Sequence, residues 1–226
     1  MYDKLFEKGC IGNVEIKNRL VMTPMGTNLA ELDGTVGPAM LAYFEARAKG
    51  GCGLIMPEIC RVNDVHGAGM LRQISATKDI HIPGLAKLAS TVHKYGSKIF
   101  IQLHHPGREG ESSLIGGQPC VSASDRMCNV SKQVTRPLTL DEIHELVGQF
   151  GDAALRCKKA GNFAGVGVKY AVNGVRSAVV KVCPELPSAL MPILKSTDNP
   201  LPGQLNNILW DYVGEHDSLG TGAAQA

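Results

Sequence analysis

The sequence predicts an α/β fold built on a parallel sheet. Short apolar runs of strand length alternate with segments of helical period along the first 161 residues. These runs lack the polar alternation of a sheet with one solvated face, so both faces are expected to be covered. Glycine and proline separate the segments, which is typical of strand–helix units joined by short loops. At 226 residues and 44% hydrophobic content, the chain is long enough for a sizeable core.

The expected elements follow one another in a simple order. They are a hairpin at 10–18, a strand at 20–22, a helix from Pro38 to Gly50, a strand at 53–58, a helix from 84 to Gly96 and a strand at 99–103. The last of these strands lies in Lys98-Ile-Phe-Ile-Gln-Leu-His-His-Pro-Gly-Arg108. Because side chains alternate along a strand, Gln102 and His104 are expected to point to the same face. Polar groups at the carboxyl end of a parallel strand lie where α/β folds bind ligands. The alternative, from this stretch alone, is a core strand that ends in polar loop residues without a functional role.

The second half of the chain is less regular. No helix or strand period is evident between Pro106 and Leu138, and a loop of this length is usually functional, a lid or a poorly ordered insert. The segment Thr139-Leu-Asp-Glu142 is a capping box that opens a helix ending at Gly161. Its expected apolar stripe consists of Leu140, Ile143, Val147, Phe150, Ala154 and Cys157. A fourth strand is expected at 163–171 and a further one at 178–183, followed by a proline-rich segment and a flexible tail.

Composition excludes several classes of function. The net charge is +2 and no basic block stands out, so neither nucleic acid nor a membrane surface is an expected partner. No apolar stretch is long enough to span a bilayer, and the N-terminus lacks the apolar region of a signal peptide. The cysteines form no Cys-x-x-Cys pair, so no metal site is expected. These features predict a cytoplasmic protein with reduced thiols.

A set of motifs in the first 161 residues resembles the N-terminal half of the old yellow enzyme family. The resemblance is nearest to the branch of NADH:flavin oxidoreductases and 2,4-dienoyl-CoA reductases. The matching motifs are Leu5-Phe6, Ile16-Lys-Asn-Arg19, Met22-Thr-Pro-Met25, Tyr43-Phe-Glu-Ala-Arg47, Gly53-Leu-Ile, Gln102-Leu-His-His-Pro-Gly-Arg108 and Arg136-Pro-Leu-Thr-Leu-Asp-Glu-Ile143. The resemblance implies a (β/α)₈ TIM barrel that holds FMN at its C-terminal face. It also implies NADH or NADPH as reductant and, as substrate, a small molecule with an activated C=C bond. That substrate would be an enone, including a steroid or bile-acid enone, or a dienoyl-CoA.

The resemblance assigns cofactor-binding positions residue by residue. It implies that Thr23, Pro24, Met25 and Gly26 pack their backbone against the flavin ring, and that Ile59, with Glu58, lies near the flavin. It implies that Gln102 hydrogen-bonds the pyrimidine edge of the ring, a role suited to an amide that both donates and accepts. His105 and Arg108 belong to the same motif, and we expect them to order the loop above the barrel.

The resemblance assigns no catalytic residue and no metal ligand. At the positions of the family's substrate-anchoring pair and tyrosine this chain has Lys169, Val172 and Val175. The family's later strands and its phosphate-binding residues are not recognisable. We therefore predict a barrel truncated to about its first four βα units over 1–170, and a divergent tail over 171–226 that is disordered or frame-disrupted. The alternative function is an inactive half-barrel fragment or interaction module, which would self-associate through its open sheet edges.

Overall fold

A computed structural model describes residues 2–170 and 176–181 of the chain, with side chains up to Asn162. Its main sheet has the strand order β10-β9-β6-β4-β3, and β5 pairs with β6 off this path. These strands are β3 (Val21–Met22), β4 (Leu54–Ile55), β5 (Ile59–Arg61), β6 (Lys98–His104), β9 (Phe163–Tyr170) and β10 (Arg176–Lys181). The neighbours from β3 to β9 pair in parallel. The expected parallel α/β sheet is therefore confirmed.

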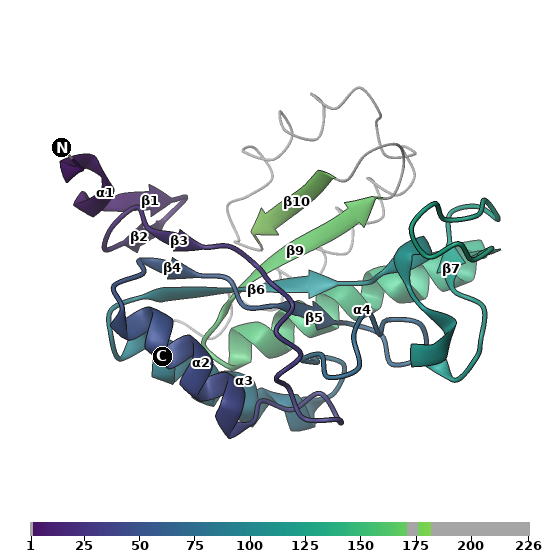
Figure 1. Cartoon of the computed structure of the whole chain (residues 1–226), viewed down its shortest axis with the longest axis horizontal. Helices are drawn as coiled ribbons and strands as arrows, with labels where there is room; N and C mark the ends of the chain where they lie inside the picture. The colour runs from purple at the N-terminus through teal and green to yellow at the C-terminus, as the bar shows by residue number, and fades with distance from the viewer. Residues whose placement is uncertain (1, 171–175, 182–226) are drawn as a thin grey trace, which may run out of the picture.

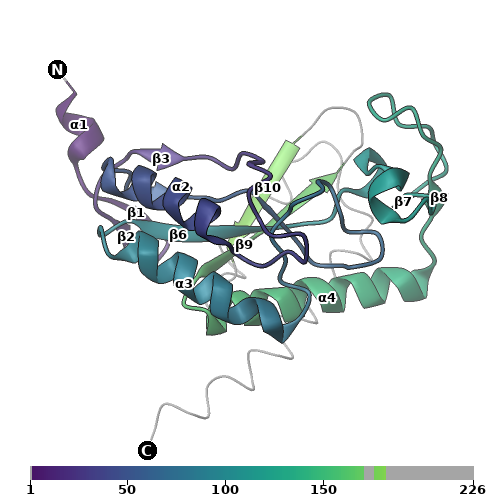
Figure 2. The same ribbon diagram turned by 60° about the horizontal axis from the view of Figure 1, so that its bottom comes forward.

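Three helices cover one face of this sheet (Figures 1 and 2). They are α2 (Pro38–Lys49), α3 (Ile82–His93) and α4 (Leu140–Lys159). Each follows a parallel strand, as βαβ crossovers require. Pro38 occupies the first turn of α2, where its missing N–H costs no hydrogen bond. Thr139 caps α4, since its Oγ1 accepts from the Glu142 N–H while the Glu142 carboxylate accepts from the Thr139 N–H. The predicted capping box is therefore confirmed.

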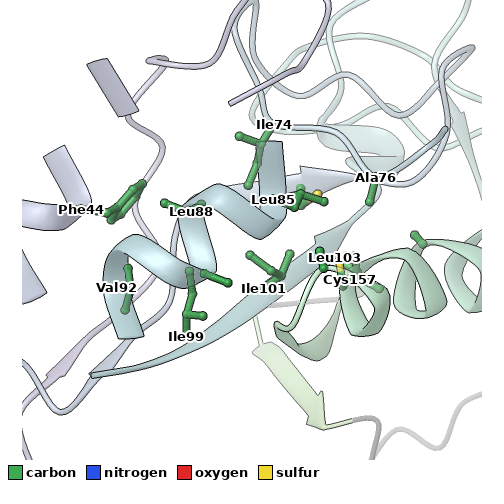
Figure 3. Packing of buried hydrophobic residues seen from close by; sticks show 14 of the residues in the cluster. Phe44, Ile74, Ala76, Leu85, Leu88, Val92, Ile99, Ile101, Leu103 and Cys157 are labelled. Atoms are coloured by element: carbon green, nitrogen blue, oxygen red, sulfur yellow. The ribbon is translucent and has the colours of Figure 1, made fainter. Parts of the chain in front are cut away.

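The main core lies between the helices and the sheet. Ile99, Ile101 and Leu103 of β6 pack on the apolar stripe of α3 and on Cys157 of α4 (Figure 3). Strand alternation sends the intervening side chains to the opposite face, where Phe100 packs with Leu54. The hairpin of β1 (Gly9–Ile11) and β2 (Val14–Ile16) covers that face at the amino end of the sheet, through Val14 and Ile16. The carboxyl end of the same face carries Gln102 and His104.

Several local expectations need correction. Leu140, placed in the buried stripe of α4, is 65% exposed, because the first turn of α4 extends beyond the sheet that covers the rest of the helix (Figure 2). The strand expected at 53–58 is shorter, and Ile59–Arg61 forms a strand of its own beside β6. The long loop contains two 3₁₀ turns and a short parallel pair, β7 (Val121–Ser122) with β8 (Arg136–Pro137).

The last described strand departs from the pattern of the sheet. β10 lies antiparallel to β9, with Arg176 opposite Tyr170, whereas the strands before it are parallel. It overlaps the strand expected at 178–183. The proline-rich segment and the predicted tail lie outside the described residues. The division into a domain at 1–170 and a divergent region at 171–226 stays a prediction.

Candidate functional site

The candidate site lies at the carboxyl ends of β3, β5 and β6. In the parallel register Ile59 stands opposite Gln102, and on its other side Gln102 stands opposite Gly165 of β9. Ile59 and His104 share one face, because a Cβ built on Gly69 would lie 3.2 Å from Ile59 Cδ1 and 3.3 Å from His104 Cε1. Side chains from adjacent strands therefore converge at this end of the sheet, as expected for Gln102 and His104.

The segment that follows β3 joins this group through its backbone. Glu58, which precedes Ile59, accepts a hydrogen bond of 2.8 Å from the Thr27 N–H. A Cβ on Gly26 would lie 2.5 Å from Met70 Sδ, so a larger residue there would require the Met70 side chain to move. Met70 therefore packs against the backbone at Gly26. Ahead of it, Thr23 and Met25 are exposed, and Met25 presents an apolar side chain with 55% of its surface accessible.

Gln102 is the polar group best placed to bind a ligand. It is only 9% exposed, and no residue in the described part of the chain hydrogen-bonds its side-chain amide. A side-chain amide without a protein partner can bond to water or to a ligand. Its oxygen accepts and its nitrogen donates, which matches a pyrimidine-type edge that offers both kinds of group. The chemistry of Gln102 therefore fits the pyrimidine edge of FMN, and the assignment of Thr23–Gly26 and Ile59 to the ring stays a prediction.

Gln73 is a site residue that sequence reasoning missed. It is 1% exposed, and its Oε1 accepts a hydrogen bond of 2.8 Å from the Gly69 N–H, which fixes the orientation of the amide. Its Nε2 is buried without a partner among the described residues. No sequence motif marks this position. Only the fold of the loop after β5 places Gln73 beside Gly69, close to Ile59 and His104.

His105 lies on the other side of the strand end, away from Gln102. It lines a cavity of about 210 Å³ together with His66, Val121 and Glu142. Its Nδ1 accepts a hydrogen bond of 3.1 Å from the Gly107 N–H. Burial of the ring, followed by the proximity of His104 and His66, lowers the pKa of His105 to about 4. The hydrogen bond to Gly107 lies at the start of the long loop, and the loop-ordering role expected for His105 stays a prediction.

The backbone carbonyl oxygen of Arg108 accepts a hydrogen bond from Ser131 Oγ, and among the described residues its side-chain Nε is buried without a partner, so a role for the guanidinium stays a prediction. Farther along, Arg136 donates two hydrogen bonds to the Glu142 carboxylate, at 2.9 and 2.7 Å. This pair and the Thr139 N–H lower the pKa of Glu142 to about 2. The end of the loop is thereby fastened to the first turn of α4.

The fold and the site together define the chain as part of a (β/α) barrel with a ligand site at the carboxyl ends of its strands. Residues 4–175 match the model of the NADH:flavin oxidoreductase / NADH oxidase family. The chain belongs to this family.

None of its described helices combines the length and the apolar character needed to cross a membrane.

Individual relatives agree with this assignment. The chain is 42% identical over 159 residues to an NADH oxidase of Thermoanaerobacter brockii, covering 70% of this chain and 24% of that enzyme. The structure of an old yellow enzyme homologue from Zymomonas mobilis matches 72% of this chain and 47% of its own, with 29% identity and a TM-score of 0.66. A 2-naphthoyl-CoA reductase in complex with 2-naphthoyl-CoA matches 74% of this chain and 27% of its own, with 27% identity and a TM-score of 0.68. The chain thus spans less than half the length of each of these proteins.

Proposed function

We propose that this chain supplies the ring-binding part of an FMN-dependent NAD(P)H oxidoreductase that reduces an activated C=C bond. The observation that carries the proposal is the side-chain amide of Gln102, which has no hydrogen-bond partner among the described residues and lies on β6 opposite Ile59, at the carboxyl end of the sheet. Bound FMN would accept hydride from NADH or NADPH and pass it to the substrate. Gln102 would bind the polar edge of the ring, and donation from its Nε2 would favour the negative charge of the reduced form. Thr23–Gly26 and Ile59 would exclude water from the ring.

The substrate class is the finer part of the proposal. An enone or a dienoyl-CoA has a C=C bond polarised by a carbonyl group, and its β-carbon accepts hydride. The match to a 2-naphthoyl-CoA reductase in complex with its thioester supports an acyl-CoA substrate. A cytoplasmic, reducing setting is also proposed, and the free thiols of the described cysteines support it.

Flavin binding by the full chain tests this function. The purified protein is titrated with FMN, and the visible flavin absorbance is followed under anaerobic conditions after NADH is added. We expect bound flavin that NADH bleaches. We expect Gln102→Leu to weaken FMN binding about tenfold, the loss that corresponds to one hydrogen bond to a buried partner. Gln118→Leu, at an exposed position, is the matched control and should leave affinity unchanged.

A colourless chain that takes up no FMN would contradict this function and favour the alternative. In that alternative the chain is an inactive half barrel or an interaction module. The edge strand β3 favours it, because Val21 is 41% exposed and β4 is the only described strand that pairs with β3. Such an edge offers unpaired backbone groups to another chain.

A further inference from the structure

Glu58 is a fully buried carboxylate that joins three segments of the candidate site. It lies between β4 and β5, with 0% of its surface exposed. Its Oε2 accepts hydrogen bonds from the Thr27 N–H at 2.8 Å, from Thr27 Oγ1 at 2.6 Å and from the Asn28 N–H at 3.2 Å. Its Oε1 accepts from the Ile74 N–H at 3.1 Å. The carboxylate thus connects the segment after β3 with the segment after β5.

The bonds to Glu58 are made by neutral groups. No lysine, arginine or histidine in the described part of the chain forms an ion pair with it. A buried carboxylate is costly unless several donors satisfy it, and backbone N–H groups can do so without a cation. Such an arrangement demands a fixed backbone, because each N–H must keep pointing at the same carboxylate.

The backbone that Glu58 holds is unusual. Asn28 has a φ of +56°, in the left-handed region that few residues other than glycine adopt. Its N–H bonds to Glu58, and its Oδ1 accepts from the Arg72 N–H at 2.7 Å. With Met70 packed against Gly26, the turn at 26–28 is held from three directions. The segment Thr23–Met25, in which Thr23 and Met25 are exposed, lies just before this turn and is thereby set in place.

We propose that Glu58 is a positioning residue, whose carboxylate fixes the turn at 26–28 so that Thr23–Gly26 presents a preset surface to the flavin ring. This inference rests on the proposed function, since it concerns the same cofactor. Glu58 itself does not contact the ring: both of its oxygens are occupied by the protein. Its effect on binding comes from preorganisation, because the segment need not be ordered when the cofactor arrives.

Substitutions at Glu58 and at its hydrogen-bond donor Thr27 test the inference. Glu58→Gln replaces one acceptor oxygen with an NH₂ group, which faces at least one N–H donor in either orientation. Thr27→Val removes the Oγ1 hydrogen bond to Glu58 and the longer bond of 3.3 Å that Oγ1 accepts from the Leu29 N–H. It keeps the shape of the side chain, so this variant is expected to fold. Thr27→Ser restores the hydroxyl. Thr35→Val is the matched control, because it removes an equivalent bond of 2.7 Å from Thr35 Oγ1 to Asp33 in an exposed turn outside the site.

Hydrogen exchange of the flavin-free chain is measured first, by mass spectrometry. We expect faster exchange in peptides covering 23–31 and 73–76 in Glu58→Gln, faster exchange in 23–31 in Thr27→Val, and no change there in Thr35→Val. FMN affinity is measured next. Thr27→Val should bind about tenfold more weakly, the effect of losing one hydrogen bond to a charged group, and Thr27→Ser should bind like the parent chain.

Unchanged exchange in Glu58→Gln would overturn the inference. Faster exchange with unchanged FMN affinity would also overturn it, because the carboxylate would then hold the turn without serving the cofactor. A parent chain that binds no FMN would contradict the proposed function instead. In that case the exchange data alone decide whether Glu58 sets the conformation of the segment.

Discussion

At the scale of single residues, the pKa of His105 has a consequence for stability. In the folded chain this pKa is about 4, whereas an unperturbed histidine titrates near ~6.5. As the pH falls below ~6.5, His105 becomes protonated in the unfolded chain but stays neutral in the folded chain until the pH approaches about 4. The free energy of unfolding therefore decreases as the pH falls from about 6.5 to about 4. His66, whose pKa burial also lowers, adds to the same slope.

We predict that His105→Gln reduces this pH dependence. Glutamine cannot titrate, but its oxygen can still accept from the Gly107 N–H. Urea unfolding at several pH values between 4 and 7 measures the slope, which should become shallower without vanishing, because His66 remains. His144→Gln, at an exposed position of α4, is the control. Equal slopes in His105→Gln and the parent chain would show that the imidazole can be protonated in place.

At the scale of elements, the start of α4 was predicted correctly from a short sequence motif. The residues that start this helix lie within four positions of one another, so the capping box could be predicted from the sequence. We expect Thr139→Ala to lower the free energy of unfolding by about 1 kcal/mol, the usual cost of losing an N-cap side chain. Chemical denaturation measures this change, with Ser113→Ala at an exposed loop position as the control. A loss no larger than that of the control would mean that the Arg136–Glu142 pair alone secures the helix start.

Other features of the elements were beyond the sequence. Periodicity correctly gave the angle of the apolar stripe on α4, but it gave no information on how far the sheet extends beneath the helix. Leu140 is exposed for this reason. The short pair of β7 and β8 has only two residues in each strand, too few for any period to be recognised.

At the scale of the whole molecule, the edge strand β3 predicts self-association. Sedimentation of the chain over a range of concentrations should show a mass that rises with concentration. Val21→Lys places a charge on the exposed edge and should shift the equilibrium toward the monomer. Val130→Lys, at a loop position that is 76% exposed, is the control for added charge. A parent chain that stays monomeric at all concentrations would contradict this prediction.

The sequence by itself determined the parallel α/β plan, the order of its helices, the shared face of Gln102 and His104, and the family. These follow from period, capping and short motifs, which act over a few neighbouring residues. Only the tertiary structure decided that Ile59 stands opposite Gln102, that Gln73 reaches the site, and that Glu58 ties residues 27, 28 and 74 together. These contacts join segments separated by many residues. Neither strand register nor a backbone hydrogen bond between distant segments can be recognised from the order of side chains in the sequence.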